Sequence, residues 1–109
     1  MSWKQAKRAC RILGGELAYF QNEAELATFN ELDFTEHTWL GMMRSKKGIN
    51  FLDVENREPI TVSNWNNGEP NNSGGDERCA EAYTNGKWND QQCTDERQVT
   101  CRFENDIYC

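Results

Sequence analysis

The chain has 109 residues, a formal net charge of -6 and a sequence pI of about 4.8. This length allows one domain with a single hydrophobic core. The acidic balance argues against electrostatic binding to nucleic acids or to anionic membranes, and no apolar run reaches the ~18 residues of a membrane-spanning helix.

The first predicted element is an amphipathic helix. Ser2 can cap a helix that begins at Trp3. Its apolar face is marked by residues at helical spacing, Trp3, Ala6, Cys10 and Leu13. Gly14-Gly15 then ends the helix, and residues 17–20 are typical of a short strand.

A second helix and a buried strand follow. Asn22 with Glu25 three residues later is a capping-box pattern, and the apolar positions after it predict a helix that continues to about Leu32. Its expected buried face consists of Leu26, Phe29 and Leu32. Residues 39–42, Trp-Leu-Gly-Met, predict a buried strand.

The second half of the chain begins with a long polar segment. Residues 44–76 are rich in Asn, Gly, Ser and charge, and we expect an ordered functional loop there with little regular structure. Residues 79–83 predict a strand, and Asn85-Gly86 is a turn signal that joins it in a hairpin to 87–90. A final strand is predicted over 99–103.

Cysteine is abundant for so short a chain. The sequence has five cysteines, no C-x-x-C pair, and His37 as the single histidine, so zinc spacing is absent. We interpret the cysteines as a disulfide framework, which predicts a secreted or extracellular protein. Several pairings are open, and the odd number leaves one thiol over.

Five oxygen-bearing side chains gather in the stretch from residue 69 to residue 90. They are Glu69, Asn71, Glu77, Asn89 and Asp90. Carboxylate and carboxamide oxygens are the donors that Ca²⁺ prefers, and the same groups can exchange hydrogen bonds with a polyol. Taken alone, Glu-Pro-Asn is an ordinary turn tripeptide and Trp-Asn-Asp a strand followed by a turn, so the indication of a site comes from their joint spacing.

The order of motifs along nearly the whole chain resembles the C-type lectin family, specifically its carbohydrate-recognition domain. Each motif is weakly specific, whereas the ordered series with its cysteines in register is strongly specific. The matching pieces are Trp3-x-x-Ala6-x-x-x-Cys10, Gly14-Gly15-x-Leu17, Trp39-Leu40-Gly41-Met42, Trp65-x-x-Gly68-Glu69-Pro70-Asn71, Glu77-x-Cys79, Trp88-Asn89-Asp90-x-x-Cys93 and Cys101.

The resemblance implies an α+β fold with two helices flanking antiparallel sheets and a long calcium-binding loop. It implies the disulfides Cys10–Cys101 and Cys79–Cys93, in one domain over residues 1–109. The family's first N-terminal strand is expected to be missing, which would leave the sheet beside 99–103 exposed. Cys109 lies beyond the family pattern and is a candidate for a disulfide-linked dimer or another multivalent assembly.

The resemblance also implies a function without catalysis: Ca²⁺ held by the five oxygen-bearing residues named above, with two positions left for neighbouring hydroxyls of a sugar. Three carboxylates and one dication would leave this site with a charge of -1. The order Glu69-Pro70-Asn71, with Pro70 in the cis form, implies mannose, glucose, N-acetylglucosamine or fucose, whereas Gln-Pro-Asp implies galactose. The expected partners are therefore glycans, with no nucleic acid and no membrane insertion.

Two further expectations concern the limits of this resemblance. The family's auxiliary calcium site uses acids at the positions of Asn72 and Arg78, so we expect one principal calcium. The alternative function is a calcium-independent protein- or ice-binding module on the same fold, because fold does not fix function.

With a single histidine, His37, we assign no catalytic role and expect that residue at the surface.

Overall fold

The structure is a computed structural model that describes residues 1–46, 50–104 and 107–109. Its elements in chain order are α1 (Trp3–Ile12), β1 (Glu16–Leu17), α2 (Glu23–Asn30), β2 (Thr38–Arg44), β3 (Phe51–Asp53), the 3₁₀ turn η1 (Ser73–Gly75), β4 (Cys79–Ala82), β5 (Trp88–Gln91), β6 (Gln98–Val99), β7 (Cys101–Phe103) and β8 (Ile107–Tyr108). None of the described helices is long and apolar enough to cross a membrane.

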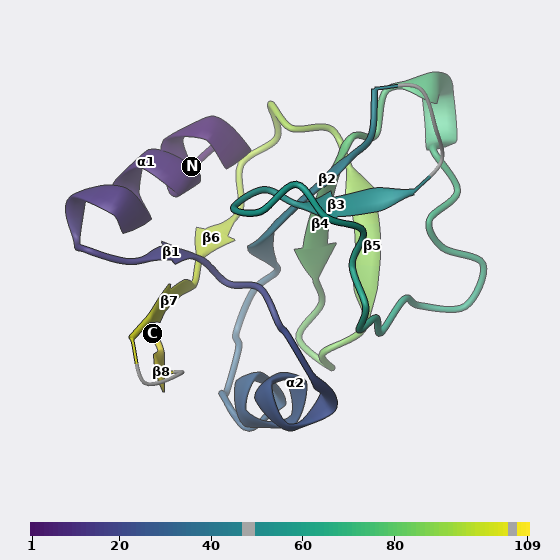
Figure 1. Ribbon diagram of the computed structural model, residues 1–109. Coiled ribbons are helices and arrows are strands. Elements are labelled where there is room, and N and C mark those ends of the chain that lie inside the picture. Colours follow the sequence, from purple (N-terminus) through teal and green to yellow (C-terminus); the bar gives the residue numbers. More distant parts are fainter. Residues whose placement is uncertain (47–49, 105–106) are drawn as a thin grey trace.

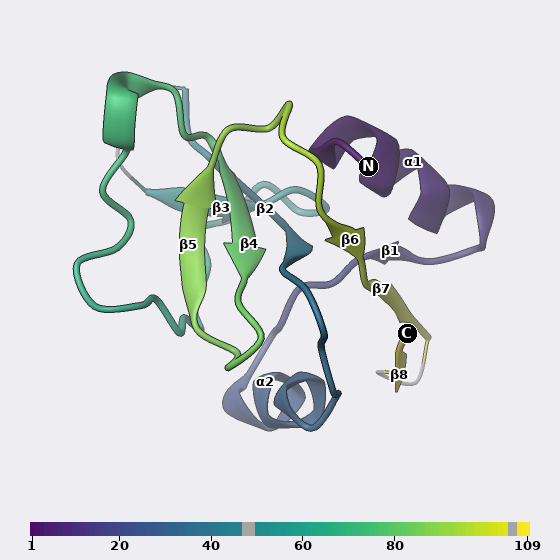
Figure 2. The same ribbon diagram turned by 180° about the vertical axis from the view of Figure 1, so that it is seen from behind.

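The strands form two sheets in the part of the chain that the structure describes. The larger has the order β3-β2-β4-β5, with β6 paired in parallel to β2, and the smaller has the order β1-β7-β8. In Figure 1, α1 and the smaller sheet lie on the left, whereas the long segment that leads to η1 lies on the right. Figure 2 shows the same separation from behind, with η1 and α1 on opposite sides of the domain.

Helix α1 is fixed at its start by a local cap and along its length by burial. Ser2 Oγ accepts a hydrogen bond from Gln5 N, and Gln5 Oε1 accepts one from Ser2 N, which completes a capping box. Trp3 is buried and donates from Nε1 to the carbonyl of Leu40 at 2.8 Å. The predicted bridge from Cys10 to Cys101 ties the helix to β7.

The core forms around the strand predicted over 39–42, which extends to Thr38–Arg44. Trp39 and Trp88 are fully buried, and the burial of Trp39 agrees with the buried strand predicted there. Gly41 is required where β2 passes β1, because a Cβ there would stand 2.7 Å from the carbonyl oxygen of Leu17. The second predicted bridge, Cys79–Cys93, also forms and ties β4 to the segment after β5.

Helix α2 begins as predicted and ends two residues early, at Asn30. Asn22 Oδ1 accepts from Glu25 N at 2.9 Å, as a cap should. The Glu25 side chain does not complete the capping box. It accepts from the backbone N of Gln21 and forms a buried, two-pronged ion pair with Arg102. This pair joins the start of α2 to β7.

Three expectations about the strands need correction. The predicted strand over 99–103 is two strands, because Thr100 separates β6, which pairs with β2, from β7, which pairs with β1. The far edge of β7 is covered by β8, so that part of the sheet is not left exposed. The strand predicted over 17–20 is only two residues long, β1 over Glu16–Leu17. The segment 44–76 has little regular structure, as expected, since β3 and η1 are each three residues long; residues 47–49 lie outside the described part.

Candidate functional site

The candidate ligands Glu69, Asn71 and Asp90 meet at one backbone N–H. The Glu69–Pro70 peptide bond is cis, as expected. The N–H of Asn71 is shared by two acceptors, Glu69 Oε1 and Asp90 Oδ1, each 3.2 Å from the nitrogen. The tripeptide is therefore folded against β5, although 19 residues separate Asn71 from Asp90.

A second backbone N–H, that of Ser73, brings together the side chains of Asn71 and Glu77. Ser73 N donates to Asn71 Oδ1 and to Glu77 Oε1, each at 3.0 Å. The short turn η1 holds this N–H between the two side chains. Four of the five predicted ligands thus lie around two neighbouring N–H groups, with Asn71 common to both.

Asp90 has a buried cationic partner that the sequence did not reveal. Its side chain is fully buried, and its Oδ2 accepts from Asn72 N at 2.7 Å and from Arg44 Nη2 at 2.5 Å. Arg44 also donates from Nε to the carbonyl of Glu77. Since Met43 pairs with Cys79, Arg44 is carried to the end of β2 beside this loop. No local pattern signals that placement, because it depends on pairing between distant strands.

Asn89 lies on the other face of β5. Asn89 is half-buried whereas its neighbour Asp90 is buried, as expected for residues on opposite faces of a strand. Asn89 stands directly opposite Glu81 of β4 in the antiparallel register. Asn89 Nδ2 donates to Glu81 Oε2 at 2.9 Å. The same carboxylate contacts His37, the predicted surface residue, whose side chain is 41% exposed. Sequence reasoning gave Glu81 no role; the signal available was a charged residue in a strand that is otherwise apolar.

The electrostatics of the loop favour a cation. Burial, and then the neighbouring Asp90, raise the pKa of the Glu69 carboxyl, and the same two causes raise the pKa of Glu77. Burial is the larger cause, and the contribution of Asp90 reflects a neighbouring negative charge at both carboxyls. With Arg44 included, three carboxylates and one guanidinium leave two net negative charges, which one Ca²⁺ would neutralise.

The donor set fits Ca²⁺ in its chemistry, since it offers carboxylate and carboxamide oxygens. Among the described residues, no three His, Cys, Asp or Glu side chains converge closely enough to form a ready-made metal cage. The carboxylate oxygens of Asp90 and Glu77 instead accept hydrogen bonds from the backbone N–H groups of Asn71, Asn72 and Ser73. A bound cation would therefore have to compete with these hydrogen bonds and draw the side chains together.

The two positions of the family's auxiliary calcium site have structural roles. Asn72 has a positive φ of 50°, and its Oδ1 accepts from Glu77 N at 3.0 Å. Arg78 donates from Nη2 to the carbonyls of Arg44 and Ser45. These contacts brace the loop and place a guanidinium where the auxiliary site would need an acid.

A cavity of about 620 Å³ borders the same loop. Asn71 lines it, together with Phe51 and Trp65. The other four candidate ligands are not among its described lining residues. The cavity therefore meets the candidate ligand set only at Asn71.

Comparison with known proteins places the chain among lectin domains. The family model described as "Lectin C-type domain" matches residues 1–103. Pulmonary surfactant-associated protein D of Bos taurus is 36% identical over 104 residues, and that of Sus scrofa is 36% identical over 107. Each alignment covers 94% of this chain, which spans only 28% of the length of those relatives.

Solved structures agree with the family model. The carbohydrate-recognition domain of the mouse scavenger receptor C-type lectin has a TM-score of 0.84 and 25% identity, over 92% of this chain and 80% of that one. The corresponding domain of cow CD23, solved in the presence of a GlcNAc2Man3 oligosaccharide, has a TM-score of 0.83 and 30% identity, over 93% and 78%.

Proposed function

Because the chain belongs to the C-type lectin domain family, whose members bind carbohydrate and catalyse no reaction, we propose that it binds terminal sugars of the mannose type in a calcium-dependent manner. The proposed ligands of Ca²⁺ are the five residues at the loop and on β5, Glu69, Asn71, Glu77, Asn89 and Asp90. The observation that carries the proposal is the gathering of four of them around two adjacent backbone N–H groups.

The side chains supply a complementary set of hydrogen-bonding groups for a sugar diol. Ionised Glu69 and Glu77 can only accept, so each can take the proton of one hydroxyl. The carboxamides of Asn71 and Asn89 can donate to the same two hydroxyl oxygens. Bound Ca²⁺ would supply the remaining attraction, by direct coordination of those oxygens. A ligand lacking either hydroxyl would leave polar groups unsatisfied, which disfavours its binding.

Specificity for the mannose-type arrangement rests on the order of acid and amide. Glu69 comes before Pro70 and Asn71 after it, so the acid precedes the amide, the order that the family resemblance associates with mannose-type sugars. The cow CD23 domain, 30% identical, was solved with an oligosaccharide that contains mannose. Weak binding of one sugar would suit a protein that presents several copies. A disulfide through the exposed thiol of Cys109 is one proposed way to join them.

Retention on a mannose resin tests this function. The chain should be retained in millimolar Ca²⁺ and released by a chelator. Asn71→Ala should abolish retention, whereas Asn67→Ala, at an exposed asparagine of the same loop, should leave it unchanged. Retention that survives the chelator would instead support a calcium-independent protein- or ice-binding module.

A further inference from the structure

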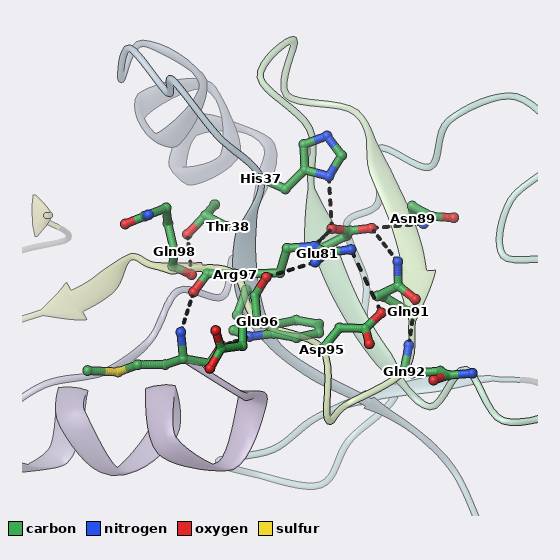
Figure 3. Close-up of polar contacts among 12 residues, drawn as sticks. His37, Thr38, Glu81, Asn89, Gln91, Gln92, Asp95, Glu96, Arg97 and Gln98 are labelled. Atoms are coloured by element: carbon green, nitrogen blue, oxygen red, sulfur yellow. Dashed lines mark hydrogen bonds and ion pairs between the residues drawn. The ribbon is translucent and has the colours of Figure 1, made fainter.

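Glu81 is a buried carboxylate that does not belong to the proposed ligand set, yet it contacts one of its members. The side chain is only 1% exposed in the middle of β4. Figure 3 shows side chains from separate parts of the chain converging on it. They are His37, Asn89, Gln91 and Arg97.

The two oxygens of Glu81 have separate tasks. Oε1 accepts a hydrogen bond from Arg97 Nε at 2.7 Å and contacts His37 Nδ1 at 3.0 Å. Oε2 receives Asn89 Nδ2 at 2.9 Å, and Gln91 Nε2 lies at the longer distance of 3.4 Å. Oε1 is thus paired with Arg97 in an ion pair, whereas the hydrogen bond from Asn89 goes to the other oxygen, Oε2.

This contact determines which end of the Asn89 carboxamide faces outward. An ionised carboxylate can only accept hydrogen bonds, so the NH₂ end of Asn89 must face Glu81. The Oδ1 atom is thereby turned away from Glu81, as Figure 3 shows. One proton of the NH₂ group is used in this bond and the other remains available to a hydroxyl.

We propose that Glu81 is a positioning residue that sets calcium affinity by holding Asn89 with its oxygen directed outward. The inference rests on the proposed function, since it concerns how one proposed ligand is prepared. Glu81 itself is enclosed by donors on both oxygens, so it acts through Asn89. Partners that orient a ligand in this way typically alter metal affinity about 10–100-fold when they are replaced.

Glu81→Gln should reverse the preferred orientation of the Asn89 carboxamide with almost no change in side-chain shape. Arg97 Nε requires an acceptor, so the oxygen of the introduced carboxamide should remain beside Arg97. Its NH₂ group then faces Asn89, which must turn its own oxygen inward to accept. We expect calcium affinity, measured by calorimetric titration, to fall about 10–100-fold.

Two further variants separate orientation from general damage to the network. Arg97→Gln removes the charged partner and leaves Glu81 to hold Asn89, so its calcium affinity should remain close to that of the unsubstituted chain. In Glu81→Gln with Arg97→Gln, the carboxamide at position 81 can turn its oxygen toward Asn89, and affinity should recover. A structural role alone predicts no such rescue.

Proton–nitrogen correlation NMR of the ion-free chain gives a readout that is independent of calcium. The Asn89 NH₂ proton donated to the carboxylate should resonate downfield of ordinary amides, lose that shift in Glu81→Gln and retain it in Arg97→Gln. Equal affinity of the unsubstituted chain and Glu81→Gln, or an equal loss in Arg97→Gln, would overturn this inference alone. Failure of the unsubstituted chain to bind calcium would overturn the proposed function.

Discussion

Arg44 and Asp90 form a buried ion pair, with Nη2 and Oδ2 2.5 Å apart. Asp90 is fully buried and Arg44 is 6% exposed, so water screens neither charge. A buried carboxylate of this kind needs a permanent cationic partner when no metal is bound. The pair thus couples the stability of the loop to the proposed calcium site.

Replacing Arg44 should therefore expose this coupling. Arg44→Met leaves Asp90 buried without its cation, and removal of one partner from a buried pair costs about 3–5 kcal/mol. Bound Ca²⁺ would supply part of the missing positive charge, so we expect a larger calcium-dependent gain in stability than in the unsubstituted chain. Urea denaturation with Ca²⁺ and with chelator measures both quantities. An equal gain in the two proteins would contradict the coupling.

Glu77 should weaken the ion-free fold at neutral pH. Its folded-state pKa is raised by burial and by Asp90, so the folded state binds more protons than the unfolded state between the two pKa values. The stability contributed by protonated Glu77 is present at low pH and is lost as pH rises through the folded-state pKa. Glu77→Gln should raise the melting temperature in chelator at pH 7.5. The variant should also lack the further rise in melting temperature that calcium causes in the unsubstituted chain. A lower melting temperature of Glu77→Gln than of the unsubstituted chain, both in chelator, would show that ionised Glu77 does not destabilise the ion-free fold.

The same shifts predict acid release of the ligand. Glu69 has a raised pKa, mainly from burial and then from Asp90, so protons compete for this carboxylate at a higher pH than for an ordinary glutamate. Calcium affinity should fall between pH 7.5 and pH 5, and sugar should be released with it. A calorimetric titration at both values measures the effect, and the prediction fails if the affinities agree.

The order of acid and amide predicts an exchange of sugar preference. Glu69→Gln with Asn71→Asp keeps one carboxylate and one carboxamide beside Pro70 and reverses their positions. By the family pattern, the double variant should bind galactose in preference to mannose and still require calcium. Competition of both free sugars against a labelled glycan measures the preference. A variant that still prefers mannose would show that other residues set the specificity.

Asp53 of β3 provides a pH test away from the candidate site. Burial raises its pKa to about 6, although Arg102 opposes the shift, and its Oδ1 has no hydrogen-bond partner among the described residues. Its contribution to stability is therefore lost as pH rises through about 6. Asp53→Asn should raise the melting temperature at pH 7.5 and change it less at pH 5. The same change at both pH values would show that Asp53 does not titrate in this range.

The sequence predicted those features whose signals are local or belong to the family motifs. The Ser2 cap and the Asn85-Gly86 turn follow from adjacent residues, and both form. The ordered motifs established the family resemblance, and the pairing of the disulfides followed from it. The division of the last predicted strand at Thr100 was missed, because it depends on which neighbour each half meets.

Within the candidate site, the oxygen donors could be named from sequence but their supports could not. Arg44 reaches Asp90 across 46 residues, and Glu81 meets Asn89 only because β4 and β5 pair in a particular register. Neither contact has a spacing that identifies it. These supports determine the charge of the site and the direction of one proposed ligand, so they carry much of its expected chemistry.

A glycan array in millimolar Ca²⁺, repeated with a chelator, tests calcium-dependent sugar binding by this chain. We expect binding to glycans that end in mannose, glucose, N-acetylglucosamine or fucose, and loss of that binding in chelator. Absence of binding to every glycan in calcium, or binding that the chelator does not change, would contradict this expectation.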